Sequence, residues 1–251
     1  MQLVVDTLLT TYQRVGNGEV ILIVHGWGDN SAGWTEFSNR LSANYEVIAL
    51  DLPGFGGTQA PPEAWDLTAY ATFVASFLNK LGVRPYALIG HSNGGAIAIR
   101  GISMELFTPE KLVLLASSGV RGEYKGRNKI LRLITKFGKL LTMPLPASIK
   151  KRLQRKVYKT IGSDMLVAEN LQETFKLVVT DDVRADAKHI QVPTLLVYGD
   201  KDPATPLKYA RALQQAIPNS RLEILPGVEH FVHLEEADQV QQLVEGFLRR
   251  A

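Results

Sequence analysis

A serine flanked by glycines is the feature of this chain whose residue types best suit chemistry. Ser92 lies in the segment Gly90-His91-Ser92-Asn93-Gly94, which has the pattern G-x-S-x-G. The apolar run 86–89 before it predicts a buried strand, and helical spacing begins directly after it. A strand that turns at once into a helix strains the residue at the corner, and glycines two residues away on either side avoid Cβ clashes. The pattern therefore predicts a sharp turn that holds the Ser92 hydroxyl beside the positive end of a helix, where it can act as a nucleophile.

A serine nucleophile needs a general base, because its hydroxyl is almost wholly protonated at neutral pH. The geometry of the turn requires a histidine from a later loop, which leaves two candidates. His230 lies just past the predicted strand 221–225, and His233 lies one turn later. The other three histidines are expected to have other roles. His25 should hydrogen-bond to backbone, His91 should point away from Ser92, and His189 should face solvent or cap a turn.

A third group must orient the imidazole of the base and stabilise its positive charge. Asp200 and Asp202 both follow the predicted strand 194–198. Loops that follow parallel strands lie at the carboxyl-terminal edge of the sheet, so either carboxylate can come near Ser92. Asp200 is also suited to cap its own turn through backbone hydrogen bonds.

The elements that must position these residues alternate along most of the chain. Apolar runs predict strands at 7–15, 20–25, 45–50, 86–89, 111–116, 194–198 and 221–225, and helical patterns occur at 67–81, about 94–105, about 206–217 and 236–249. Such alternation predicts an α/β fold with a mostly parallel sheet that helices cover on both faces. The first two strands are joined by Gly16-Asn17-Gly18-Glu19, which predicts an antiparallel hairpin at the start of the sheet.

Residues 121–187 interrupt this alternation and predict a helical cap inserted into a core of residues 1–120 and 188–251. Helical patterns cover 128–141 and 149–161, and a third helix is expected at about 164–179 with Ser163 as its N-cap. An inserted helix must bury its apolar face, so we expect one stripe of the first cap helix to line the substrate pocket. Its members are Ile130, Leu133, Ile134 and Phe137.

Positive charge is concentrated in the same part of the chain. The net charge of the whole chain is only +3, but residues 121–160 contain thirteen Lys and Arg residues and one acidic residue, Glu123. The simplest interpretation is a solvated helix face. The alternative is weak attraction of anionic substrates or anionic membrane surfaces, while nothing in the sequence supports nucleic-acid binding.

Several motifs together resemble the α/β-hydrolase superfamily over nearly the full length of the chain. They are His25-Gly26-Trp27-Gly28, Asp51-Leu52-Pro53-Gly54-Phe55-Gly56, Gly90-His91-Ser92-Asn93-Gly94-Gly95, Gly199-Asp200-Lys201-Asp202 and Glu229-His230-Phe231. The resemblance implies the α/β-hydrolase fold. It also implies a catalytic triad in the chain order serine, acid, histidine.

The resemblance assigns roles to individual residues. It favours Ser92 as nucleophile, Asp202 rather than Asp200 as the acid, and His230 as the base, with His233 left as a surface or packing residue. The backbone N–H groups of Trp27 and Asn93 are the expected oxyanion donors, and the Trp27 ring either lines the acyl pocket or packs in the core. Asp51 is expected to shape a turn.

A serine nucleophile favours hydrolysis of carboxylic esters through an acyl-enzyme, and so a carboxylesterase. Relatives that act on haloalkanes or epoxides carry an aspartate as the nucleophile, so Ser92 disfavours these two activities. Cleavage of carbon–carbon bonds of the meta-cleavage type is an alternative, although Phe231 stands where many such hydrolases have tryptophan. Thioesterase or lysophospholipase activity, and a hormone-sensor-like binding protein with weak turnover, are further alternatives.

The composition of the chain bears on cysteine chemistry, metal sites and localisation. The 251-residue chain has no cysteine, which excludes disulfides, thiol nucleophiles and cysteine metal sites. No cofactor and no metal is expected, since no cluster of metal-ligating residues remains beside the triad. The N-terminus has no signal-peptide pattern, and no apolar run approaches the ~20 residues of a membrane span. The sequence predicts a soluble, cytoplasmic protein with a small-molecule ester substrate and no obligate protein partner.

Overall fold

A computed structural model of the chain describes residues 1–121 and 171–249. Two of the predicted cap helices, at 128–141 and 149–161, lie outside these ranges, and so do the N-cap Ser163 and the beginning of the third helix. In the described part of the range predicted for that third helix, α6 spans Gln172–Thr180 with Leu171 as its N-cap. The predicted division into core and cap stays a prediction.

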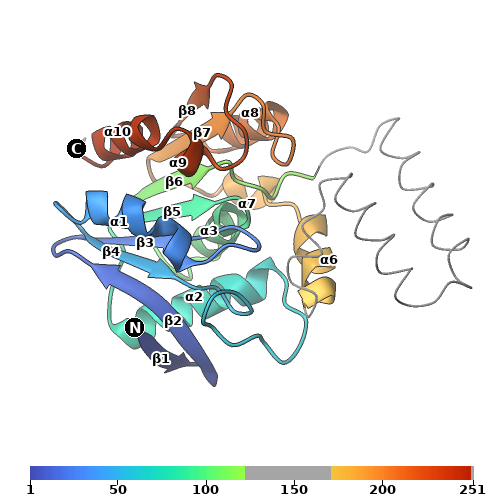
Figure 1. The fold of residues 1–251 in the computed structure, drawn as a ribbon. Coiled ribbons are helices and arrows are strands. Elements are labelled where there is room, and N and C mark those ends of the chain that lie inside the picture. Colours follow the sequence, from blue (N-terminus) through green and yellow to red (C-terminus); the bar gives the residue numbers. More distant parts are fainter. Residues whose placement is uncertain (122–170, 250–251) are drawn as a thin grey trace, which may run out of the picture.

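The described residues form an eight-stranded sheet in the order β1-β2-β4-β3-β5-β6-β7-β8 (Figure 1). The strands are β1 Gln2–Val5, β2 Leu8–Val15, β3 Val20–Val24, β4 Glu46–Leu50, β5 Ala87–His91, β6 Lys111–Leu115, β7 Thr194–Gly199 and β8 Ser220–Leu225. β1 and β2 pair antiparallel with their neighbours, and every pairing from β4 to β8 is parallel. The predicted α/β fold with a mostly parallel sheet is confirmed.

Helices cover both faces of the sheet and create two apolar cores (Figure 1). One face packs against α2 Leu67–Leu81, α3 Asn93–Ser103, α7 Arg184–Ala187 and α8 Leu207–Ala216. The other packs against α1 Thr35–Leu41, α9 Val232–Glu235 and α10 Ala237–Leu248, next to the short 3-10 turn η1 Ser31–Trp34. Every residue of β5, β6 and β7 is buried, as expected for parallel strands covered on both sides.

The predicted hairpin between the first two strands is wrong. β4 lies between β2 and β3, and the antiparallel hairpin is formed instead by β1 and β2. Residues 21–24 of β3 are all buried, so β3 occupies the interior of the sheet with a parallel neighbour on each side. The loop after β2 crosses over β4, and Gly16 has a φ of 83° where a Cβ would lie only 2.2 Å from the Tyr45 carbonyl oxygen.

Candidate active site

Ser92 lies at the corner between β5 and α3 in the strained conformation that the sequence predicts, with φ 49° and ψ −117°. The flanking glycines allow this corner to pack tightly. A Cβ on Gly94 would lie 2.0 Å from the Val24 carbonyl oxygen, and one on Gly90 would lie 2.6 Å from Gly95 Cα. Only glycine therefore lets α3 start this close to β3 and β5.

The structure brings Ser92, His230 and Asp202 together from three loops. His230 Nε2 lies 3.0 Å from Ser92 Oγ, and His230 Nδ1 lies 2.8 Å from Asp202 Oδ2. A carboxylate can only accept a hydrogen bond, so Nδ1 carries the proton and Nε2 has its lone pair directed at the serine hydroxyl. These are the contacts that a serine nucleophile, a base and an orienting acid require.

Asp202 is held by its own loop as well as by His230. Its side chain is buried, Oδ1 accepts hydrogen bonds from the backbone N–H groups of Ala204 and Thr205 at 2.7 and 2.9 Å, and Oδ2 accepts from the Thr205 hydroxyl at 2.5 Å. Burial alone would raise the pKa of the Asp202 carboxyl, but the hydrogen bond and charge of His230 and the Thr205 donors lower it below its usual value. Asp202 is therefore an anion at neutral pH.

Asp200 has a different position. Its Oδ1 accepts a hydrogen bond from the Gly227 backbone N–H at 2.7 Å, and its Oδ2 faces Lys201 Nζ at 3.6 Å. The Asp200 N–H donates to the Leu225 carbonyl at 3.1 Å. Asp200 thus ties the β7 loop to the loop that carries His230, and it is Asp202 that contacts the imidazole.

Thr205 is a site residue that the sequence reasoning missed. Besides donating to Asp202, its Oγ1 lies 3.1 Å from the Ala116 carbonyl oxygen and 3.5 Å from His230 Nδ1. The available signal was the spacing Asp-x-x-Thr, in which an aspartate accepts the N–H groups two and three residues later.

Two other histidines near Ser92 are structural. His25 accepts a hydrogen bond from the Leu52 N–H at Nε2, 3.0 Å, so its Nδ1 carries the proton and donates to the Gly26 carbonyl at 2.7 Å. This confirms the expected backbone contact. His91 Nε2 lies 3.1 Å from the His230 carbonyl oxygen and thus supports the loop of the base.

His233 is a packing residue, one of the two roles expected for it. Its ring is buried and stacks on Trp34 with a centroid separation of 3.9 Å and an interplanar angle of 10°. Among the described residues neither ring nitrogen has a hydrogen-bond partner. Burial, with a smaller effect of His230, lowers the pKa of His233 to about 3, so the ring is neutral. His189 is exposed and lies 3.1 Å from the Ser103 hydroxyl.

A cavity of about 220 Å³ opens beside Ser92 and His230. Trp27 and Asn93 line it, and within the described part of the chain neither backbone N–H has an acceptor. The Trp27 ring lies 4.9 Å from that of Phe55 and 5.1 Å from that of Phe175, centroid to centroid, so it both packs and lines the cavity.

Helix α6 supplies apolar walls of this cavity that the sequence did not identify: Phe175, Val178 and Val179. The stripe expected to line the pocket, Ile130, Leu133, Ile134 and Phe137, lies outside the described residues. Asp51 has the structural role expected of it, because its two oxygens accept the Ser31 and Gly57 N–H groups at 2.6 and 2.8 Å.

Within residues 1–121 and 171–249, no group of three or more His, Asp or Glu side chains is arranged to hold a metal ion. No helix in those ranges is long and apolar enough to cross a membrane.

Comparisons with known proteins identify a family for this chain. A profile of the alpha/beta hydrolase family matches residues 21–243. The chain is 29% identical to a pimeloyl-[acyl-carrier protein] methyl ester esterase of Vibrio cholerae, over 95% of this chain and 98% of that one. It is 28% identical to a 2-hydroxy-6-oxononadienedioate/2-hydroxy-6-oxononatrienedioate hydrolase of a Pseudomonas species, over 94% and 90% of the two chains. The crystal structure of a membrane phospholipase A superposes with a TM-score of 0.80 at 25% identity, over 100% of this chain and 86% of that one.

Proposed function

Because the chain belongs to the alpha/beta hydrolase family, we propose that it hydrolyses carboxylic esters through an acyl-enzyme formed on Ser92. One observation carries the proposal. A strained serine, an imidazole and a buried carboxylate lie in series, with contacts of 3.0 and 2.8 Å. The similarity to an esterase over almost the whole length of both chains supports ester hydrolysis in particular.

In the first half of the reaction, Ser92 Oγ attacks the ester carbonyl carbon while its proton moves to His230 Nε2. The negative charge of Asp202 stabilises the resulting imidazolium. The carbonyl oxygen becomes an oxyanion, for which the free N–H groups of Trp27 and Asn93 are the proposed donors. Loss of one such donor typically costs about 2.7–4 kcal/mol of transition-state stabilisation.

The tetrahedral intermediate then collapses. The bond between the carbonyl carbon and the leaving oxygen breaks, and the proton on His230 Nε2 passes to the leaving alkoxide, which departs as the alcohol. In the second half a water molecule takes the place of Ser92 Oγ. It gives a proton to His230 Nε2 as its oxygen attacks the acyl carbon. The bond between that carbon and Ser92 Oγ then breaks, the proton on His230 Nε2 returns to Ser92 Oγ, and the carboxylic acid is released.

Cleavage of a carbon–carbon bond is the second candidate, since a hydrolase of 2-hydroxy-6-oxononadienedioate is similar over 94% of this chain. The same three residues would serve that reaction. A substrate screen separates the possibilities when it includes p-nitrophenyl esters of graded chain length, acyl thioesters and a vinylogous diketone. We expect the esters to be turned over with the highest kcat/KM.

The role of Ser92 is tested with a fluorophosphonate, which labels an activated serine. The parent protein should become labelled and hydrolyse p-nitrophenyl esters, and Ser92→Ala should lose both properties while keeping the parent's circular-dichroism spectrum. Ser118 is a second serine on the same cavity, and Ser118→Ala should still be labelled. Labelling without turnover of any substrate would favour a binding protein, and activity above a few per cent in Ser92→Ala would refute the proposed nucleophile.

A further inference from the structure

Arg121 places a positive charge at the edge of the cavity that contains Ser92 and His230. Arg121 lines this cavity with an exposed side chain. Within residues 1–121 and 171–249, no carboxylate forms an ion pair with its guanidinium group. The acidic residue on the same cavity, Asp181, is already paired with Arg100 at 3.0 Å.

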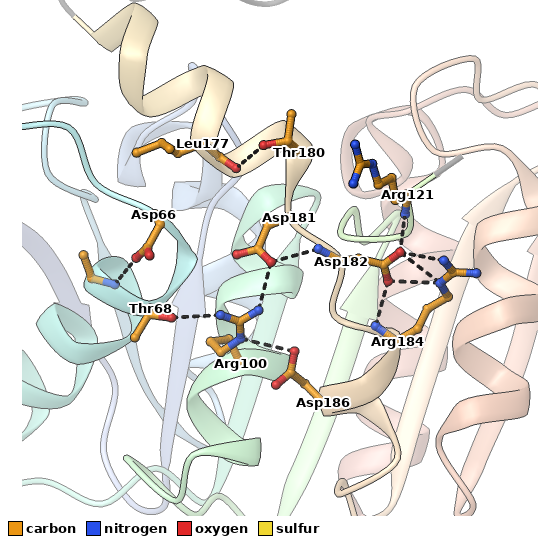
Figure 2. A network of polar contacts seen from close by, with 11 residues as sticks. Asp66, Thr68, Arg100, Arg121, Leu177, Thr180, Asp181, Asp182, Arg184 and Asp186 are labelled. Atoms are coloured by element: carbon orange, nitrogen blue, oxygen red, sulfur yellow. Dashed lines mark hydrogen bonds and ion pairs between the residues drawn. The ribbon is translucent and has the colours of Figure 1, made fainter. Parts of the chain in front are cut away.

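Asp182 binds the backbone N–H of Arg121, and Arg184 neutralises the charge of Asp182. The Arg121 N–H donates to Asp182 Oδ2 at 3.2 Å. Both oxygens of Asp182 are bound by Arg184, with Nη2–Oδ2 at 2.7 Å and Nε–Oδ1 at 3.0 Å. Figure 2 shows the Arg121 guanidinium pointing away from this pair, on the far side of its own backbone N–H. Arg121 is therefore anchored by its main chain, and within the described ranges its guanidinium group is not engaged by a carboxylate.

We propose that Arg121 forms a subsite for an anionic group of the substrate, a carboxylate or a phosphate carried away from the scissile bond. The subsite rests on the proposed ester hydrolysis at Ser92. A guanidinium presents its N–H donors in a planar fork that matches two oxygens of either anion. An anion in the cavity would meet no unpaired acidic side chain among the described lining residues, since Asp181 is matched by Arg100.

The test compares p-nitrophenyl esters whose acyl chains have equal length and end in a carboxylate, a phosphate or a neutral carboxamide. A second set carries the carboxylate or carboxamide on the phenol, which shows the side of the ester that Arg121 faces. The parent should prefer at least one anionic ester over its carboxamide by about tenfold in kcat/KM, the scale of one hydrogen bond between charged groups. Added salt should reduce this preference.

Arg121→Gln should abolish the preference and change kcat/KM for the carboxamide esters by less than about twofold. Arg121→Lys should keep part of the preference. Arg84→Gln removes an equal charge near the opposite end of β5 and should behave like the parent. An unchanged preference in Arg121→Gln, or an equal loss on the charged and neutral esters, would overturn the subsite.

A binding measurement separates failure of the subsite from failure of the proposed reaction. The ligands are the free acids of the anionic acyl chains, a dicarboxylate and a carboxylic acid that ends in a phosphate. Calorimetric titration with these acids requires no turnover. Tighter binding to the parent than to Arg121→Gln supports the subsite even if no ester is hydrolysed, and equal binding to both proteins counts against it.

Discussion

The backbone of Ser92 is strained, and hydrogen bonds to its main chain hold it in that conformation. A non-glycine residue in this backbone region costs on the order of 1–3 kcal/mol, and the surroundings must offset that cost. The Ser92 N–H donates to the Leu115 carbonyl at 3.0 Å, and its own carbonyl accepts from Gly95 and Ser118 at 3.1 and 2.9 Å. The Ala96 N–H adds a longer contact to the same carbonyl at 3.4 Å, so four hydrogen bonds fix the main chain and leave the hydroxyl free to face His230.

The two aspartates of the β7 loop should differ sharply on substitution. Asp202→Asn places an amide beside His230 Nδ1, and an amide N–H₂ there favours the tautomer in which Nε2 carries the proton. We expect kcat on the best ester to fall by about 10⁴-fold, as in other serine–histidine–aspartate sites. Asp200→Asn keeps an acceptor for Gly227 and should cost less than about tenfold. A larger loss at position 200 would reverse the assignment of the acid.

Sequence reasoning reached Ser92, Asp202 and His230 because each lies in a short motif next to a predicted strand. It missed Thr205 and Phe175 for a physical reason. Thr205 acts through a side-chain contact with Asp202, and Phe175 reaches the cavity from helix α6 through packing against Trp27. The Thr205 contact follows the local spacing Asp-x-x-Thr, which is too short a pattern to identify a site residue on its own. The Phe175 contact leaves no pattern in the sequence, because it depends on how helix α6 meets the loop that carries Trp27.

Helix ends could be predicted from the sequence, whereas the pairing of strands could not. Helix α2 begins and ends at the predicted residues because its signals are local: the Asp66 side chain caps the Ala69 N–H at 2.8 Å, and Gly82 ends the helix at φ 67°. Strand pairing is not local, and the glycines after β2 serve a crossover instead of a hairpin. The true hairpin turns at Asp6 and Thr7, with φ 44° and 76°, where no glycine signals it.

Arg100 joins the helix that follows Ser92 to three other elements. From α3 it donates to Thr68 of α2 at 2.8 Å, to Asp181 after α6 at 3.0 Å and to Asp186 of α7 at 3.2 Å (Figure 2). Its side chain is only 16% exposed. Because Asp181 lines the cavity, this network fixes one wall of the site relative to α3.

Arg100→Met should therefore destabilise the protein while keeping the apolar stem packed. The substitution leaves two partly buried carboxylates without their cation, so we expect the free energy of unfolding to fall by about 1–3 kcal/mol in urea titrations. Adding Asp181→Asn and Asp186→Asn should restore part of the loss. Arg249→Ala breaks an exposed pair with Glu245 and should cost less than about 1 kcal/mol. Equal losses in the Arg100 and Arg249 variants would mean that the network adds no stability.

At the scale of the whole molecule, three histidines are kept neutral inside the fold. His25, His91 and His233 are each no more than 2% exposed and lie beside the loops at the carboxyl-terminal edge of the sheet. Burial lowers the pKa of each, and at His91 the neighbouring His233 and His230 rings add to the effect, since a second or third positive charge in this cluster would be repelled. The site is thus built on imidazoles that gain a proton far more readily when the chain unfolds.

This arrangement predicts a loss of stability that begins well above the pKa of carboxyl groups. Between the ordinary histidine pKa of 6.5 and the folded value of about 3 for His233, the unfolded chain binds a proton that the folded chain does not. The free energy of unfolding should therefore be constant above pH 6.5 as far as these groups are concerned, and His233 alone should lower it by about 1.4 kcal/mol per pH unit below pH 6.5. His25 and His91 act in the same direction, since the pKa of each is lowered in the folded protein. Asp202, whose folded pKa is lowered, has the same sign but acts only near and below its ordinary value of 3.8. Urea titrations at pH 7.5, 6 and 5 measure the slope.

His233→Phe keeps an aromatic ring against Trp34 and should reduce the slope of stability against pH by the contribution of one proton. The control His189→Gln replaces an exposed histidine and should leave the slope unchanged. A parental slope in His233→Phe would show that this ring takes up its proton equally in the folded and unfolded protein.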